Sequence, residues 1–104
     1  MYLAITCDGL ALKQPERTND LYASYWQRLG PEQIAAVLAE HDAGEMTEDR
    51  SAVMVPVATL RRLAAGHVPE GWDADFDAML AKARERGWLS DDGATVRAHL
   101  ERER

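Results

Sequence analysis

Three aspartates at alternate positions, Asp73, Asp75 and Asp77, have the spacing of the first three ligands in a calcium-binding EF-hand loop. That loop also requires glycine at its sixth position and a bidentate glutamate at its twelfth. These two positions hold Ala78 and Arg84. The pattern therefore predicts no calcium site, and we expect the carboxylates in the first turn of a helix, where they interact favourably with its free N–H groups.

The histidines and the single cysteine form no metal-binding or catalytic motif. His41, His67 and His99 are far apart and make neither an HxH nor an HExxH pattern. Cys7 precedes Asp8, whose negative charge works against formation of a reactive thiolate. The chain also contains no GxSxG element and no glycine-rich phosphate loop. We therefore predict no catalytic group, no cofactor and no metal, with a small-molecule enzyme or binding protein kept as a third alternative.

The composition limits the broad class of the protein. The 104 residues fit one domain, residues 1–104, and carry 12 basic against 18 acidic side chains for a net charge of −6. This excess disfavours general nucleic-acid binding, which relies on surplus lysine and arginine. No apolar run approaches the length of a membrane span, and the N-terminus lacks the basic region of a secretory signal. One cysteine suits a reducing compartment, so we expect a cytoplasmic protein.

Nearly all of the negative charge lies in the middle third of the chain. Residues 31–60 contain one basic and six acidic side chains, a net charge of −5. The densest part runs from Glu40 to Arg50. It is interpreted either as a solvated helix end and loop or as an acidic docking surface for a basic partner, with Glu45, Glu48 and Asp49 as partner-binding candidates.

Aromatic residues supply the second set of partner-binding candidates. Apolar side chains recur at helical spacing over residues 18–29: Leu21, Tyr22, Tyr25, Trp26 and Leu29. This spacing predicts a helix that is capped near Thr18 and ends at Gly30. Such a stripe packs in a core or covers a partner, and we expect Tyr22, Tyr25 and Trp26 to contribute to binding. Trp72 joins them, because it lies in a Pro/Gly-rich loop that favours exposure.

The remaining segments predict a mixture of strands and helices. Asp8-Gly9 between apolar runs indicates a hairpin of strands near 2–7 and 10–13. Helices are expected from Pro31 to about His41, from Val57 to Ala65, and from Asp73 to about Gly87, with a further strand at 52–55. Residues 95–101 alternate apolar and polar, which favours a strand paired with Trp88-Leu89, although helix spacing also fits.

Basic side chains near the C-terminus suggest an alternative function. They are Arg61, Arg62, Lys82, Arg84, Arg86 and Arg97. A helix followed by a turn and a strand is the element order of a winged-helix domain, whose helix binds DNA. The acidic residues on the same helix weaken this interpretation.

The fold class predicted from the sequence is α+β. We expect a single small domain of about four helices, with a small antiparallel sheet from the N- and C-terminal hairpins. The leading functional hypothesis is a non-catalytic interaction or regulatory domain that binds a protein partner or a second copy of itself. A winged-helix-like DNA-binding regulator is the alternative.

Overall fold

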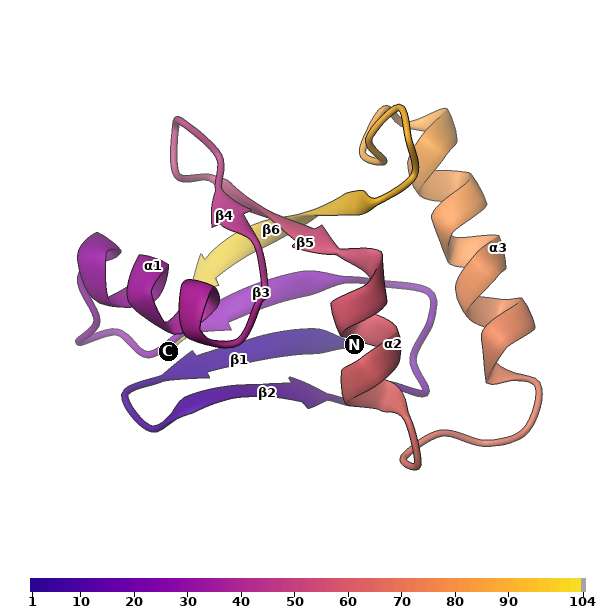
Figure 1. Cartoon of the computed structure of the whole chain (residues 1–104), viewed down its shortest axis with the longest axis horizontal. Helices are drawn as coiled ribbons and strands as arrows, with labels where there is room; N and C mark the ends of the chain where they lie inside the picture. Colours follow the sequence, from indigo (N-terminus) through magenta and orange to yellow (C-terminus); the bar gives the residue numbers. More distant parts are fainter. Residues whose placement is uncertain (104) are drawn as a thin grey trace.

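The computed structural model describes residues 1–103, which form three helices and one sheet of six strands (Figure 1). The strands are β1 (Tyr2–Thr6), β2 (Gly9–Lys13), β3 (Tyr22–Tyr25), β4 (Glu45–Met46), β5 (Ala52–Pro56) and β6 (Thr95–Arg102). The helices are α1 (Pro31–Glu40), α2 (Val57–Ala64) and α3 (Trp72–Glu85). None of these helices combines the length and apolar character that crossing a membrane requires.

The sheet is mixed, with the strand order β2-β1-β3-β6-β5-β4. The three central strands β1, β3 and β6 run parallel, and antiparallel pairs flank them on both sides. The sheet curls, and α1 and α2 lie together on one side of it (Figure 1). Helix α3 lies at one end of the molecule, beyond α2.

The side chains of the strands alternate between the helix-covered face and the opposite face. Leu3 and Ile5 of β1 and Val53 and Val55 of β5 are fully buried in the core beneath the helices. Tyr2 points to the opposite face, which we call the outer face. There its ring stacks on Tyr22 of β3, with ring centroids 5.0 Å apart.

Several local predictions are confirmed. The predicted N-terminal hairpin joins β1 to β2, with Cys7 and Asp8 in the turn and Gly9 paired with Thr6, and α1 begins at Pro31 as expected. Strand β5 ends at Pro56 and leads directly into α2. Residues 95–101 adopt the strand conformation, within β6.

The predicted fold class is wrong. Residues 1–103 contain three helices rather than about four, and the sheet is a six-stranded mixed sheet rather than a small antiparallel one. The helix expected over residues 18–29 is replaced by a loop and β3. This segment is extended because β3 is inserted between β1 and β6, and hydrogen bonds on both of its edges outweigh the helical spacing of its aromatic residues.

The predicted pairing of residues 95–101 with Trp88-Leu89 is present as a short hairpin. Leu89 forms an antiparallel bridge with Val96, the Arg97 N–H donates to the Trp88 carbonyl at 2.7 Å, and the Ser90 N–H donates to the Thr95 carbonyl at 2.9 Å. The hairpin does not form a separate small sheet, because β6 lies inside the six-stranded sheet between β3 and β5. The helix, turn and strand that suggested a winged-helix domain are therefore present as α3, residues 90–93 and β6, but β6 is an internal strand of a six-stranded mixed sheet.

Candidate functional site

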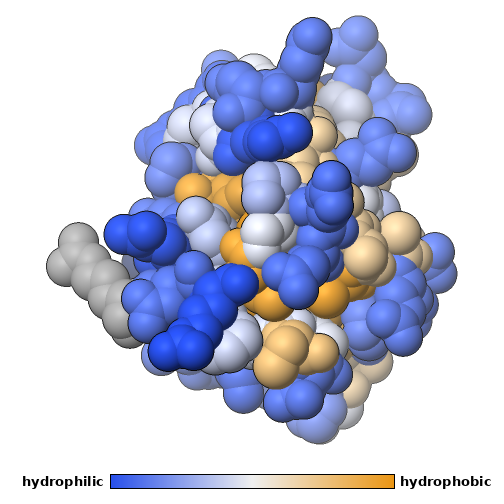
Figure 2. Space-filling model, turned by 90° about the vertical axis from the view of Figure 1, so that its left-hand side faces the viewer, coloured by the Kyte–Doolittle hydropathy of each residue, from blue (hydrophilic) through white to orange (hydrophobic). Residues whose placement is uncertain are grey.

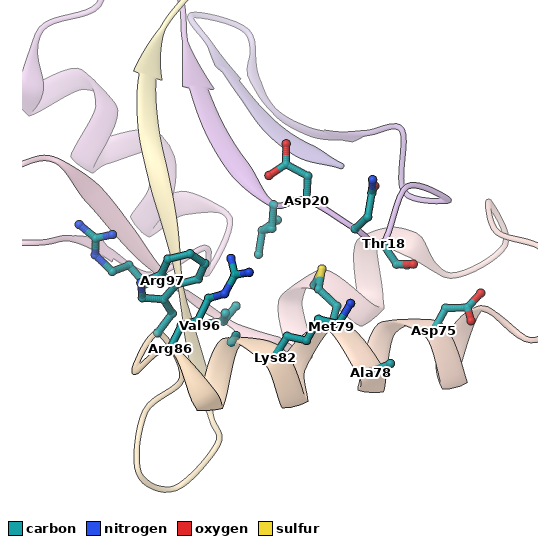
Figure 3. A pocket seen from close by; sticks show the side chains of 13 residues that line it. Thr18, Asp20, Asp75, Ala78, Met79, Lys82, Arg86, Val96 and Arg97 are labelled. Carbon is teal, nitrogen blue, oxygen red and sulfur yellow. The ribbon is translucent and has the colours of Figure 1, made fainter.

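A cleft of about 390 Å³ lies between α3, the loop that precedes β3, and β6 (Figure 3). A second hollow of about 450 Å³ shares part of this lining and extends over the outer face of β3 and β6. We call the two together the α3 groove. The side chains shared by both hollows are Asp20, Leu21, Trp88 and Arg97.

Two buried aromatic rings at the start of α3 hold this wall of the groove in place. Trp72 is only 4% exposed, and its ring stacks on Phe76 with centroids 4.7 Å apart. The indole N–H of Trp72 donates a 2.6 Å hydrogen bond to the Pro15 carbonyl oxygen, which lies in the loop before β3. On the other side, Arg61 of α2 lies over the Phe76 ring and forms an ion pair with Asp77 at 2.6 Å. These contacts connect α3 to the loop and to α2.

The end of α3 determines where Trp88 lies. Gly87 has a φ of +77°, in the left-handed region that favours glycine. The Gly87 N–H donates to the Arg84 carbonyl, and the Trp88 N–H donates to the Ala83 carbonyl at 2.8 Å. This is the hydrogen-bond pattern of a Schellman motif, which reverses the chain direction at a helix end. The reversal places Trp88 at the groove with 40% of its surface exposed.

The cationic side chains gather at one part of the groove. Figure 3 shows Arg86 and Arg97 at one end of the cleft, Lys82 next to them, and Asp75 at the opposite end. The Arg86 guanidinium lies 5.1 Å from the centre of the Trp88 ring. Within residues 1–103, no carboxylate comes within ion-pairing distance of Lys82, Arg86 or Arg97.

The floor of the groove is apolar, whereas its rim carries charge of both signs. The apolar lining consists of Leu21, Ala78, Met79, Ala83 and Val96. Asp20 lines the wall opposite α3, and its carboxylate is directed away from Met79 and Lys82 (Figure 3). At the far end of the outer-face hollow, His99 lies 3.9 Å from Glu101. The charged side chains on the rim that form no ion pair with one another can each form one with a bound ligand.

Tyr22 lines the extension of the groove over the outer face. Partial burial raises the pKa of its hydroxyl group above the ordinary value of 10.0, and the neighbouring Tyr2 adds to the effect. The hydroxyl is therefore neutral near pH 7 and can both donate and accept a hydrogen bond.

The structure does not bring the four predicted partner-binding aromatics together. Tyr22 lies on the outer face, whereas Tyr25 packs against the core from the same strand. Trp26, at the end of β3, is 36% exposed. The expected exposure of Trp72 is wrong, because its loop ends one residue earlier and Trp72 itself begins α3 in the core.

The three predicted acidic residues lie around β4. Glu45 and Glu48 line a hollow of about 420 Å³ between α1 and β4, where Arg50 offsets part of their charge. Asp49 accepts hydrogen bonds from Thr47 and Ser51 within its own loop. This side of the molecule is mostly hydrophilic, with apolar side chains visible between the polar ones (Figure 2).

The sequence identified the cations of the groove but not the groove itself. The sequence places Lys82, Arg86 and Arg97 among the cations of a possible DNA-binding segment, and it places Trp88 only as a strand partner of residues 95–101. The signal that could have located Trp88 is its place after Gly87, because the residue after such a glycine lies where the chain turns back. Asp20 gave no usable signal, because only the long-range packing of its loop brings it to α3.

No protein-family model, curated protein or solved structure matches this chain. Within residues 1–103, there is also no group of three or more His, Cys, Asp and Glu side chains that could hold a metal ion. The chemistry of the α3 groove is therefore the basis for a functional proposal.

Proposed function

We propose that this protein is a non-catalytic interaction domain, and that its α3 groove binds an acidic segment of a protein partner. The observation that carries the proposal is that three cations, Lys82, Arg86 and Arg97, line the same groove as the exposed Trp88, and that no carboxylate of residues 1–103 lies within ion-pairing distance of them. An exposed tryptophan beside arginine is the combination that dominates binding energy in protein interfaces.

The chemistry of the cations favours a carboxylate ligand. A guanidinium presents parallel N–H donors that match the two oxygens of a carboxylate. The Trp88 ring supports Arg86 from one side and limits the freedom that the side chain would lose on binding. The apolar floor beside these charges would accept an aliphatic or aromatic neighbour of the acidic residue.

The shape of the groove favours a peptide over a compact small molecule. The two hollows form one open path that runs from Asp75 along α3 and past Trp88 to Glu101. Asp75 and Glu101 stand at the two ends of this path, and the cations stand between them together with Asp20. Duplex DNA would bring phosphates against Asp75 and Glu101, so an isolated acidic residue within a peptide fits the charge pattern better. Because Cys7 is an exposed free thiol, we place this activity in the reducing cytoplasm.

A peptide selection tests the proposal directly. A random dodecapeptide library would be selected on the wild-type protein and counter-selected on Arg86→Ala. We expect enriched peptides to contain Asp or Glu next to an apolar residue. In fluorescence anisotropy, Arg86→Ala and Arg97→Ala should each weaken binding at least tenfold, equivalent to about 1.4 kcal/mol. Arg84→Ala is the matched control, because Arg84 lies on the same helix but does not line the groove.

Three results would refute the proposal. The first is a failure to enrich any peptide that distinguishes the wild type from Arg86→Ala. The second is binding that shifts the amide resonances of Glu45 and Glu48 and leaves those of Lys82 and Trp88 unchanged. The third is displacement of the peptide by a DNA duplex at low salt, with DNA binding that is itself weakened by Arg86→Ala. That outcome would assign the groove to nucleic acid.

A further inference from the structure

Strand β2 is an edge strand of the sheet, and both α1 and α2 contact it. It is hydrogen-bonded to β1 on one side and is the last strand in the sheet order. Its sequence, Gly-Leu-Ala-Leu-Lys, contains no proline, and its only charge is Lys13 at the end. In Figure 1, β2 runs along the lower border of the molecule. An edge of this kind is a template for pairing with another strand.

The direction of the backbone groups of β2 follows from the neighbouring pairs. The Trp26 N–H donates to the Ile5 carbonyl at 2.9 Å, so Ile5 directs its backbone groups toward β3. Because this direction alternates along a strand, Ala4 directs its groups toward β2, where it is paired with Ala11. Leu10 and Leu12 therefore direct their N–H and C=O groups away from the sheet. Within residues 1–103, these groups have no hydrogen-bond partner.

We propose that β2 pairs with β2 of a second copy of this chain, antiparallel and around a two-fold axis at Ala11. In this register Leu10 lies opposite Leu12 of the second copy, and the reverse pair is equivalent by symmetry. The two pairs exchange four N–H···O=C hydrogen bonds and use every outward backbone group of Leu10 and Leu12. The result is a sheet that continues from one molecule into the next.

Charge complementarity favours a second copy over a foreign strand. In the same register Lys13 lies opposite Gly9 of the second copy, so its charge lies next to the turn that carries Asp8. Lys13 and Asp8 are both exposed, and within residues 1–103 neither forms an ion pair. The two-fold axis creates this contact twice, once at each end of the paired strands.

The test combines an oligomer measurement with hydrogen exchange of the full chain. Sedimentation equilibrium should show a monomer–dimer equilibrium. The Leu10 and Leu12 amides should exchange more slowly as the protein concentration rises, whereas the Leu3 amide, inside the sheet, should not respond. Ala11→Lys places two lysines directly opposite each other on the outer face and should weaken the dimer more than tenfold. Ser24→Lys is the matched control, because Ser24 lies on the same face of the internal strand β3.

A charge exchange keeps the test decisive if Ala11→Lys fails to fold. Lys13→Asp should weaken the dimer, and the double variant Asp8→Lys/Lys13→Asp should restore it. A monomer at every accessible concentration would overturn the proposal, as would a dimer that tolerates both Ala11→Lys and Lys13→Asp. Leu10 and Leu12 amides whose exchange does not depend on concentration would overturn it as well.

Discussion

The Trp72 side chain gives the sharpest test of how α3 is held, because it is both stacked and hydrogen-bonded. In Trp72→Phe, loss of the indole N–H removes the bond to the Pro15 carbonyl, which contributes about 1 kcal/mol net. Loss of the pyrrole part of the ring removes about two methylene equivalents of buried surface, at roughly 0.8 kcal/mol each. The expected decrease in the free energy of unfolding is therefore about 2.5 kcal/mol.

Urea unfolding followed by far-UV circular dichroism measures this decrease. With a slope of about 1.5 kcal/mol per molar, the midpoint should fall by roughly 1.7 M. Tryptophan fluorescence supplies a second readout, because the two remaining indoles, Trp26 and Trp88, are 36% and 40% exposed. The emission of the folded variant should therefore shift to longer wavelength. Trp26→Phe is the control and should change stability by less than about 0.5 kcal/mol. Equal midpoints for the two variants, or an unshifted spectrum for Trp72→Phe, would refute this account of α3.

Two further predictions concern the loops around β4 and β5. Hydrogen bonds from Thr47 and Ser51 lower the pKa of Asp49 from 3.8 to about 2, so the loop gains stability above pH 3.8 and loses it as the pH falls through about 2. In an NMR pH titration, the Ser51 amide chemical shift should change with a midpoint at the pKa of Asp49, and this change should be absent in Asp49→Asn. A midpoint near pH 4 would contradict the hydrogen bonding. Gly44→Ala would place a methyl group on a backbone carbonyl oxygen of β5 and should cost about 3 kcal/mol of stability in urea unfolding. Gly66→Ala, with a similar positive φ but open space, should cost about 1 kcal/mol, and equal losses would exclude a steric origin.

Local sequence patterns predict the structure of a segment correctly where that structure depends on residues within the segment. Pro31 and Pro56 mark the starts of α1 and α2, and Gly87 marks the end of α3. The Asp8-Gly9 turn predicted the hairpin for the same reason, because its strands are neighbours in the sequence. In each case the deciding interaction spans only a few residues.

The segment around β3 shows why the sheet could not be predicted in the same way. Tyr22 and Tyr25 have helical spacing, yet the partners that make the segment a strand are residues 2–5 and 99–102. These partners lie at opposite ends of the described chain, and no local pattern records their proximity. The same long-range pairing places β6 between β3 and β5, in addition to the short hairpin that it forms with residues 88–90. Because one central strand was assigned to a helix, the strand order of the whole sheet could not be predicted.

The two tryptophans of α3 show how the same local signal leads to different roles. Trp72 and Trp88 each follow a glycine with positive φ, Gly71 and Gly87. Gly71 precedes the helix, so Trp72 lies on its first turn and enters the core beside Phe76. Gly87 follows the helix, so Trp88 lies on the reversed chain and remains 40% exposed.

Packing at the end of α3 explains why an apolar residue follows Gly87, but it does not explain why this residue is as large as tryptophan. A Schellman motif is commonly accompanied by an apolar contact from this position back to the helix, which a smaller side chain could also provide. The exposed part of the indole instead meets Arg86 and faces the groove that contains Lys82 and Arg97. Keeping a large aromatic surface in water beside unpaired cations contributes little to folding, whereas covering it with a ligand would release that water and pair the charges. The end of α3 is for this reason the place where binding should be sought first.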